Sequence, residues 1–557
     1  MDNNYLIKEL LKILKPYRKK IIGIMFFLVI TSGINLLIPM LTKVLMDKGF
    51  IGKNKNILFL TIFSIFILYI TNILLDLLKE KERIKIASQI RYQLRENSFM
   101  HLMRLKIKYL NDMNYSEILN NIDIDINNIC KITDNAAFFS ITQILSVIGG
   151  VLGLCIINFQ LAIVVLIFIP IKYVIVKHFS KETQRNTVIY IERLNEYIKW
   201  FANIIAGMKE VRIFGIGKSK KREFEEWQMN VTEDIMRLDW ISTLNTEIDS
   251  ILTHSLITLI YILGAIKVLN NKITVGDVFS FSTYSLYVIS PISNLLNIKT
   301  ILSGILPSTK RFLELINLPE EEYGGEVCLD SGDIIFKDIE FSYSDGIKVL
   351  DGINLCIPHG KKVAFWGCNG SGKSTILNIL LRFYNLDDGK IIFNGINIEL
   401  FDLVSYRRKI TLVNQEVYLF NSTLRENICL DKNIDDKLLL EAIKSCGLDE
   451  YYNEESLNYI VGENGARLSG GQKQKVALAR AIIQNREIVI FDEVTSNIDV
   501  YSENKLKKIL NNELKDKTVI FVTHQEEFLK HMDIVFVLKK GKLKCQGTYD
   551  QICKNIK

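Results

Sequence analysis

Hydrophobic residues form six long stretches within the first 300 positions of the chain. A helix needs about 20 mainly apolar residues to cross roughly 30 Å of hydrocarbon. Most of the stretches reach that length, and the polar flanks of the shorter fourth one can continue its helix into water. The pattern therefore predicts six membrane-spanning helices in residues 1–310, centred on Ile21–Leu41, Ile57–Leu78, Ala136–Phe159, Leu161–Val176, Ile251–Val268 and Val275–Leu295.

Lysine and arginine are concentrated in two long segments, one between spans two and three and the other between spans four and five. Cationic loops stay on the cytoplasmic side of a membrane, so both segments and both termini are predicted to be cytosolic. One short loop on the predicted outer side opposes this assignment, because it carries Lys43, Lys48, Lys53 and Lys55.

Apolar residues recur at helical spacing beyond the spans, so the helices are predicted to continue into the cytosol. They are Ile86, Ile90, Leu94 and Phe99 in one segment, and Leu194, Ile198 and Phe201 in the other. A further amphipathic helix precedes the first span and carries its apolar face on Leu6, Ile7, Leu10, Leu11 and Leu14. Such a face fits either the membrane surface or the helical bundle.

Four ionisable residues lie inside or near the cytosolic ends of the spans: Lys172, Glu247, Asp249 and His254. Charges at that depth often mark a transport pathway. The favoured alternative is that Lys172 extends to the membrane interface and that the others lie in water below it.

Composition narrows the class of protein. The 557 residues include 69 basic and 62 acidic ones, 48% hydrophobic and 24% charged. This excludes a disordered or collagen-like chain. A net charge of +7 does not require nucleic acid, since anionic lipid on the inner leaflet attracts basic loops equally well. The nine cysteines show no CxxC pair and are expected to be reduced thiols.

The pattern changes after about residue 310. Residues 311–331 are predicted to be a linker, and short β-branched runs then alternate with helical patterns through 332–557. That alternation predicts an α/β domain with a largely parallel sheet. Its clearest strands are Lys362–Trp366, Ile410–Val413, Ile488–Phe491 and Val519–Val522.

A glycine-rich loop follows the first of these strands and matches the phosphate-binding pattern G-x-x-x-x-G-K-[ST]. Its backbone N–H groups and the helix behind it attract phosphate. Lys373 is predicted to reach the β- and γ-phosphates of ATP, and Ser374 to ligate Mg²⁺. The predicted ATP-binding residues here are Gly367, Asn369, Gly370, Ser371, Gly372, Lys373, Ser374 and Thr375.

Two further motifs belong to the same chemistry. The strand Ile488–Phe491 delivers Asp492 to the magnesium ion and Glu493 to the attacking water. Ser469, Gly470, Gly471 and Gln472 open a second helix with an anion-binding N-terminus. One nucleotide cannot use both helix ends if they lie on opposite faces, which predicts a head-to-tail dimer in which each chain lends this second element to its partner's ATP.

With these motifs in this order, the whole chain resembles an ATP-binding cassette (ABC) transporter of the half-transporter exporter type. The resemblance implies that Tyr343 stacks on adenine, that Gln415 touches Mg²⁺ and senses the membrane domain, and that His524 holds the γ-phosphate and the attacking water. Glu493, His524 and Gln415 are then the catalytic set, and Ser374, Gln415 and Asp492 the magnesium set. Asp499 would signal across the dimer, in a loop reading Ser-Asn-Ile-Asp where the family more often has Ser-Ala-Leu-Asp.

The resemblance also implies segments that couple the two domains. Tyr115-Ser-Glu117 stands where the family often has Thr-Gly-Glu, Gly207–Phe214 is similar to the second coupling region, and Val461–Gly465 resembles the segment that meets the partner's cytoplasmic helices.

The implied function is ATP-driven export of a lipid, hydrophobic drug, peptide or natural product across the cytoplasmic membrane by alternating access. The partners would be a second half-transporter, membrane lipid and the transported substrate, with no nucleic acid. A homodimer is favoured, with a heterodimer left open. An ATP-gated membrane regulator or channel is an alternative, a soluble cassette ATPase is a weaker one, and an importer is disfavoured.

Overall fold

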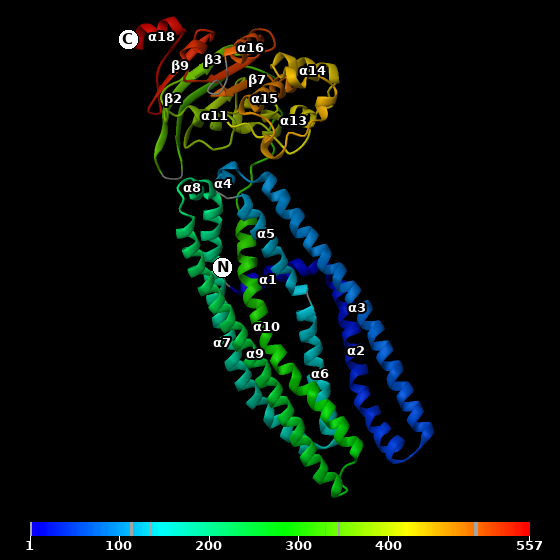
Figure 1. Cartoon of the computed structure of the whole chain (residues 1–557). Helices are drawn as coiled ribbons and strands as arrows, with labels where there is room; N and C mark the ends of the chain where they lie inside the picture. The colour runs from blue at the N-terminus through cyan, green and yellow to red at the C-terminus, as the bar shows by residue number, and fades with distance from the viewer. Residues whose placement is uncertain are drawn as a thin grey trace. The chain divides into compact units, whose positions relative to one another are not determined.

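The computed structural model describes residues 3–111, 115–133, 135–328, 330–343, 346–494 and 500–556. Within these, only the backbone is described for 3, 111, 115–117, 119–121, 135–140, 294–304, 500–504 and 554–556. The chain forms two compact units, a helical unit of residues 1–103 and 114–318 and a mixed unit of residues 104–113 and 319–557 (Figure 1).

Long helices build the helical unit, and each predicted span lies within one of them. Their bounds are α1 Asn3–Leu14, α2 Arg18–Val44, α3 Lys55–Arg104, α5 Tyr115–Cys130, α6 Asn135–Ile157, α7 Phe159–Ala206, α8 Met208–Ile213, α9 Gly217–Leu269 and α10 Val275–Ile316. Short 3₁₀ turns occupy Lys15–Tyr17 and Lys131–Thr133, and a π-helix, η2, extends α2 over Leu45–Ile51. The predicted continuation of the helices past the apolar stretches is confirmed, because α3, α7 and α9 run far beyond those stretches.

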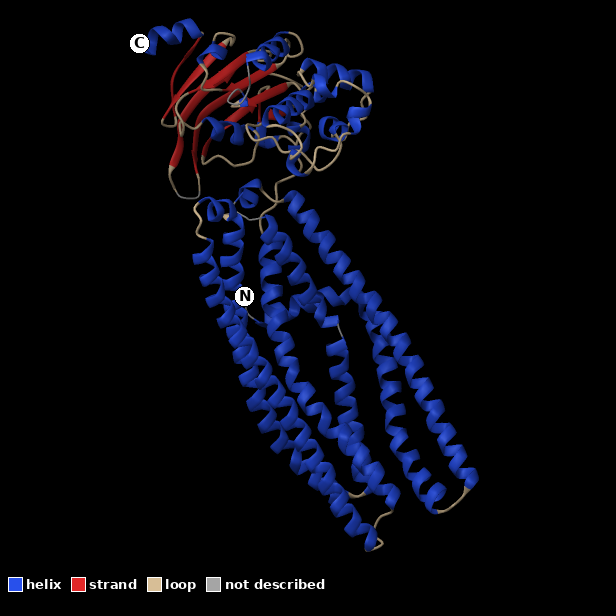
Figure 2. Ribbon diagram, viewed as in Figure 1, coloured by secondary structure: helices blue, strands red, loops and turns tan. Residues whose placement is uncertain are grey.

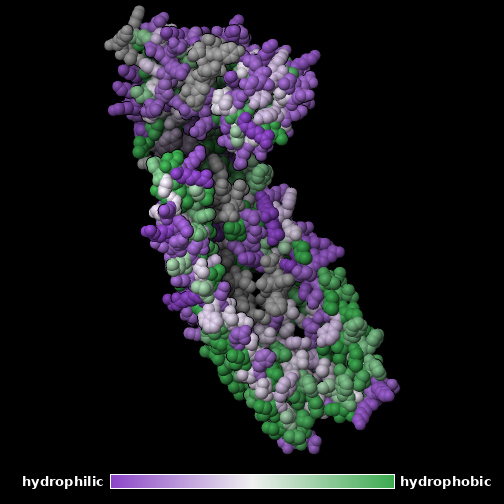
Figure 3. Space-filling model, viewed as in Figure 1, coloured by the Kyte–Doolittle hydropathy of each residue, from purple (hydrophilic) through white to green (hydrophobic). Residues whose placement is uncertain are grey.

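Four helical stretches among the described residues are long and apolar enough to cross a membrane. They are Asn4–Ile51, Lys55–Arg104, Phe159–Ala206 and Gly217–Leu269, and Ile141–Ile157 is a shorter apolar helix. Figure 3 shows hydrophobic side chains covering much of the outer surface of this unit. Spans three and six include residues whose side chains lie outside the description, so the full count of six crossings stays a prediction.

Close helix packing holds the α2–α6–α10 core of the helical unit together. A Cβ added to Gly153 of α6 would lie 2.8 Å from the Tyr284 ring of α10, and one added to Gly149 would lie 2.1 Å from a methyl carbon of Leu36 on α2. Small residues let backbones approach in membrane bundles, where lipid provides little drive for helices to associate. The glycines of α6 therefore set the spacing of this core.

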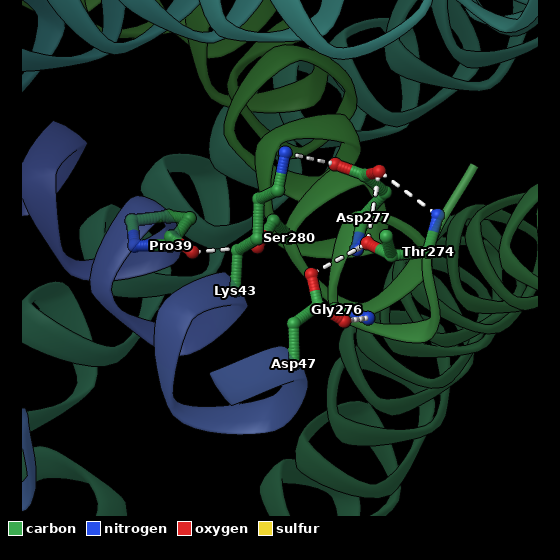
Figure 4. A network of polar contacts seen from close by, with 7 residues as sticks. All are labelled: Pro39, Lys43, Asp47, Thr274, Gly276, Asp277 and Ser280. Carbon is green, nitrogen blue, oxygen red and sulfur yellow. Dashed lines mark hydrogen bonds and ion pairs between the residues drawn. The ribbon is translucent and has the colours of Figure 1, made fainter. Parts of the chain in front are cut away.

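A polar seam joins α2 to α10 along their predicted outer halves. Tyr284 donates to the carbonyl oxygen of Leu36, and Ser280 donates to that of Pro39, each at 2.6 Å. Nearer the helix ends, the Lys43 ammonium lies 2.6 Å from the Asp277 carboxylate (Figure 4). This ion pair neutralises one of the four lysines that opposed the predicted topology.

The N-terminus of α10 is capped from two directions. Thr274 and Asp277 form a capping box, and Asp47 of η2 accepts hydrogen bonds from the Thr274 hydroxyl and the Gly276 N–H, at 2.6 and 2.8 Å (Figure 4). Carboxylates there satisfy free N–H groups and favour the positive end of the helix dipole. The α10 start is thereby tied to η2.

Two apolar faces predicted from the sequence are only partly buried in the described structure. The apolar face of α1 is divided, because Leu6 and Leu10 are buried whereas Ile7 and Leu11 are exposed, so the bundle covers only part of it. α3 confirms the predicted helix, and within it Ile86, Ile90 and Leu94 are buried whereas Phe99 is 62% exposed. Ser98 and His101 are buried there instead, because the Phe99 side chain points away from the buried face of α3.

The mixed unit contains two sheets (Figure 2). One is antiparallel with order β2-β1-β4-β5, and the other has order β10-β9-β3-β8-β7-β6 and is parallel except for its β10 edge. The strands are β1 Ile334–Ser342, β2 Lys348–Ile357, β3 Lys362–Trp366, β4 Asp388–Phe393, β5 Ile396–Asn397, β6 Ile410–Val413, β7 Ile488–Asp492, β8 Thr518–Val522, β9 Ile534–Lys539 and β10 Lys542–Gly547. The predicted largely parallel sheet is confirmed.

Helices accompany these sheets in the same unit. They are α4 Ile107–Asn111, α11 Lys373–Leu380, α12 Leu403–Arg407, α13 Leu424–Cys429, α14 Asp436–Ser445, α15 Gly470–Gln484, α16 Val500–Asn511, α17 Glu526–Leu529 and α18 Tyr549–Ile556, with 3₁₀ turns at Ile398–Leu400, Asp449–Tyr451, Glu455–Asn458 and Glu463–Gly465. α10 continues to Ile316, so the first part of the range predicted as a linker is helical.

Candidate functional site

Four neighbouring strands bring the predicted site residues to one edge of the parallel sheet. β8 lies between β3 and β7, and β6 flanks β7. The phosphate loop follows β3, His524 follows β8, and Asp492 ends β7. Since the carboxyl ends of parallel strands meet at one edge, motifs more than a hundred residues apart converge there, as ligand sites in open α/β sheets do.

The phosphate loop depends on glycine at specific positions. Gly370 and Gly372 have φ of 74° and 101°, a region that other residues rarely adopt. A Cβ on Gly367 would lie 2.3 Å from the Leu538 carbonyl oxygen, and one on Gly372 would lie 2.6 Å from the Leu350 side chain. Any larger residue would displace the loop, so its backbone is held open for a ligand.

Lys373 crosses this loop from the start of α11. Its ammonium donates to the carbonyl oxygens of Gly367 at 2.8 Å and Cys368 at 3.1 Å, and the residue is 5% exposed. Burial lowers the pKa of the ammonium below its ordinary value, and the nearby carboxylates of Glu493 and Asp492 oppose that shift. Its hydrogen bonds go to neutral carbonyls, so the cation can transfer to an anionic ligand without breaking an ion pair.

Asp492 has a buried carboxylate oxygen, Oδ1, with no hydrogen-bond partner in the described part of the chain. Burial raises the pKa of this carboxyl, Glu493 adds to the rise, and Lys373 opposes it. Buried polar atoms are nearly always paired, so an unpaired oxygen calls for a ligand. Carboxylate and hydroxyl oxygens suit Mg²⁺, and Asp492 with Ser374 would hold the ion, which supplies positive charge to the phosphates when bound.

Glu493 and His524 face each other across β7 and β8. His524 Nε2 lies 2.7 Å from Glu493 Oε1. Glu493 has φ of 49°, an uncommon conformation for a residue that is not glycine, while its N–H donates to the Val522 carbonyl at 3.0 Å. Backbone outliers of this kind cluster at functional sites. Here the outlier lies at the residue expected to polarise water.

Aromatic residues pack around Tyr343, the residue expected to stack on adenine. The Tyr343 ring packs edge-on against Phe341 and Tyr384, at centroid distances of 4.9 and 5.3 Å. Its hydroxyl lies 3.2 Å from the Thr375 hydroxyl on α11. Thr375, predicted as a nucleotide contact, therefore fixes Tyr343, and Tyr384 joins the site without having been predicted from the sequence.

Among the described residues, the helix end at Ser469 makes no hydrogen bond with the phosphate loop. Ser469 caps α15 through a capping box with Gln472, and Gln472 also donates to Glu450 at 3.0 Å. Ser469 and Gly470 are exposed, and Gly471 is half-buried. Their first-turn N–H groups thus lie at the surface of the unit, as expected of an element offered to another molecule.

Four other predicted elements have different outcomes. Gln415 follows β6 and is exposed, with no side-chain hydrogen bond to the described residues. Asp499 lies outside the described residues, and so do the side chains of Tyr115–Glu117. The second coupling region forms the short helix α8, whose C-terminal flank exposes Phe214.

In the helical unit, the expectation that Lys172 extends to the membrane interface is wrong. Its side chain is fully buried, 2.9 Å from the Asp249 carboxylate and 3.2 Å from the Thr253 hydroxyl, both on α9. Ser293 of α10 donates to the same carboxylate at 2.6 Å. Glu247 and His254 are exposed on another face of α9. Lys172 and Asp249 are far apart in sequence, so no local pattern indicated their pairing.

Family models match both units of the chain. The model of the ABC transporter transmembrane region matches residues 21–292, and that of the ABC transporter ATP-binding region matches residues 350–496. The chain belongs to the ABC transporter family. Its ATP hydrolysis is coupled to transport, and it is a multi-pass membrane protein with an α-helical membrane domain followed by an α/β ABC domain.

Similar proteins cover nearly the whole transporter. An uncharacterised ABC transporter ATP-binding protein, YknV, of Bacillus subtilis is 29% identical, covering 98% of this chain and 92% of the relative. An ATP-dependent lipid A-core flippase of Legionella pneumophila is 28% identical, covering 99% and 95%. A bacterial Atm1-family ABC exporter, solved with ATP bound, has the same fold, with a TM-score of 0.79 at 20% identity over 97% of this chain and 96% of that one.

This chain carries one membrane region and one ATP domain. This is the arrangement of a half-transporter, which implies pairing with a second half-transporter. The predicted fold class and ATP cofactor are thereby confirmed, and the six membrane crossings, the site roles and Mg²⁺ stay predictions.

Proposed function

We propose that two copies of this chain form an exporter that uses ATP to move an apolar or amphiphilic substrate out of the cell across the cytoplasmic membrane. The observation that carries the proposal is the division of the phosphate-binding machinery. Lys373, Asp492, Glu493 and His524 converge at one sheet edge, whereas Ser469 opens a separate, exposed helix end. A second chain supplies that helix end to complete each site.

ATP closes the two ATP domains in this proposal, because it contacts Lys373 of one chain and Ser469 of the other. Charge-assisted hydrogen bonds to phosphate are the strongest that these groups make. Moving a two-state equilibrium from 1:99 to 99:1 requires the favoured state to bind roughly 5.5 kcal/mol more tightly. Several such contacts made only in the closed dimer supply a preference of that size.

Hydrolysis then resets the transporter. Glu493 orients and polarises the attacking water, and His524 holds it against the γ-phosphate. Asp492 and Ser374 would hold the Mg²⁺ ion, which Gln415 would contact. Lys373, Ser469, Glu493 and His524 are all competent residue types, which supports two active sites in a homodimer. Both termini and the ATP domain lie in the cytosol, in agreement with the basic content of the two long segments.

The proposed substrate class is drawn from the relatives. The flippase relatives are named for lipid A-core, which favours a lipid or another amphiphile over a soluble peptide for this chain. The ABC regulator or channel alternative gains no support from a specific feature of the described residues.

Replacing Glu493 with Gln tests the proposal. Turnover of ATP by the lipid-reconstituted protein is expected to fall by about 10²–10⁴-fold, the usual contribution of a general base, while ATP still binds. ATP-dependent uptake of a labelled lipid into inside-out vesicles should disappear with it. Glu487→Gln, an acidic residue just before β7, is the matched control. Unchanged turnover in Glu493→Gln would remove this residue from the proposed role, and ATP hydrolysis without any uptake would favour the regulator alternative.

A further inference from the structure

Helix α9 presents two chemically different faces at the cytosolic end of its predicted span. One face is packed inside the helical unit, where Asp249 pairs with Lys172, and Leu256 and Ile260 are buried. The other face borders an open hollow of about 830 Å³. The lining residues are Glu247, Ser250, Ile251, His254, Ser255, Thr258, Leu259 and Ile262.

The hollow has a polar half and an apolar half. Glu247, Ser250, His254 and Ser255 occupy the half nearer the cytosol, and Leu259 and Ile262 occupy the half further into the predicted span. Glu247 and Ile262 are 15 positions apart, which corresponds to about 22 Å along a helix. Polar side chains within a span almost always face the bundle interior or a water-filled cavity. A face of this kind fits an amphiphile with its head near Glu247.

Glu247, Ser250 and Thr258 offer hydrogen-bond acceptors to this hollow, beside the possible donors His254 and Ser255. Ser250 donates its hydroxyl proton to the Thr246 carbonyl at 3.0 Å, and Thr258 donates to the His254 carbonyl at 2.9 Å. Each hydroxyl oxygen therefore has only its lone pairs left for a ligand. Glu247 has no hydrogen bond or ion pair with the described residues, and an ionised carboxylate is also an acceptor alone.

No permanently charged cation lines this hollow, and His254 is the ionisable base in its lining. None of its residues is lysine or arginine, and the nearby Lys172 is buried on the other face and already paired with Asp249. A second hollow of the helical unit differs, because its polar end carries acidic and basic residues that pair with each other: Asp76 with Lys79 and Glu80 with Arg83. Of these two hollows, only the one on α9 has a carboxylate without a lysine or arginine partner in its lining.

We propose that the α9 face binds an organic ammonium ion with an apolar tail as the transported substrate. The N–H groups donate to Glu247 and to the Ser250 hydroxyl oxygen, and the tail lies against Ile251, Leu259 and Ile262. Charge-assisted hydrogen bonds of this type are stronger than neutral ones. The assignment of this ligand as cargo rests on the proposed export function, whereas the binding itself does not.

The test uses dodecylammonium, with dodecanoate as the anionic amphiphile of equal chain length, and the full chain reconstituted in nanodiscs. Binding is measured by equilibrium dialysis, with empty nanodiscs subtracted to remove partition into lipid. We expect the ammonium to bind at least about tenfold more tightly than dodecanoate. Glu247→Gln should weaken ammonium binding by about tenfold, the effect of losing one charged hydrogen bond. Glu233→Gln, an exposed acid on the same helix but outside the hollow, is the matched control and should leave the affinity unchanged.

Three results would overturn the proposal. They are equal affinity for dodecanoate, equal weakening by Glu233→Gln and Glu247→Gln, and a Ser255→Cys variant that cross-links to its copy in a second chain while resisting a water-soluble thiol reagent. The last result would mean that a second copy covers this face. ATP turnover measured on the same preparation separates the two proposals, since hydrolysis without ammonium binding leaves the transporter function intact and removes only this site.

Discussion

Two buried lysines, one in each unit, have opposite roles because their partners differ. Lys172 is fully buried and lies 2.9 Å from the Asp249 carboxylate, with Thr253 as a second partner. Lys373 is nearly as buried, yet its ammonium bonds only the neutral carbonyls of Gly367 and Cys368. The first charge is compensated inside the protein, and the second is left for a ligand.

The two lysines differ in how the free-energy cost of burying their charge is offset. A buried charge is costly unless it is paired, so the lysine without a carboxylate hydrogen bond lies where an anion is expected to bind. A paired lysine gives little net stability, but removing its partner is strongly destabilising. Burial alone therefore does not distinguish a ligand-binding lysine from a structural one, whereas its hydrogen-bond partners do.

The largest effect is expected for Lys373→Met. Loss of a charge that stabilises the transferring phosphate lowers turnover by about 10²–10³-fold, with little change in the folding of the ATP domain. ATP turnover and equilibrium ATP binding measure the two parts of this effect. Lys390→Met, an exposed lysine of β4 in the same unit, is the control. Near-normal ATP affinity and turnover in Lys373→Met would show that its cation is not held for phosphate.

The next effect concerns Asp249→Asn, which leaves Lys172 buried without a carboxylate. Breaking a buried ion pair costs about 3–5 kcal/mol, and the lower end applies because the Asp249 side chain is 28% exposed. Thermal unfolding in detergent should therefore shift to lower temperature, while the double variant Lys172→Met, Asp249→Leu recovers most of the loss. The exposed Lys181→Met serves as the control on α7. Equal stability of Asp249→Asn and the native chain would contradict the assignment of this pair as structural.

The ATP domain was more predictable from the sequence than the membrane domain, for a physical reason. The phosphate loop and the Asp492–Glu493 pair are short motifs at strand ends, and parallel strands bring such ends together. The Lys172–Asp249 and Lys43–Asp277 pairs join residues on separate helices, and apolar periodicity indicates which residues form helices but not which helices meet. Tyr384 and the φ of Glu493 depend on tertiary packing in the same way.

A smaller effect is expected in the pH dependence of Mg²⁺ binding. The pKa of Asp492 is raised mainly by burial, so its protonated form persists to higher pH than that of an ordinary aspartate. Below this pKa a proton must leave before Mg²⁺ binds, and affinity should fall by about tenfold per pH unit, as follows from linkage. Mg²⁺ titrations in the presence of ADP at several pH values measure this. Asp492→Asn should bind more weakly and lose the part of the acid-dependent slope that exceeds the titration of the ADP phosphate itself; an unchanged slope would contradict the assignment.

Mixed dimers of differently tagged chains test most directly the claim that one chain completes the ATP site of the other. One chain carries Lys373→Met and its partner carries Ser469→Ala, and tandem affinity purification isolates the pair. In this pair, one site combines both defects, while the other combines an intact phosphate loop with an intact Ser469 helix. Turnover well above that of either variant homodimer is therefore predicted. Turnover no higher than in those homodimers would mean that each chain uses its own Ser469, contradicting the account.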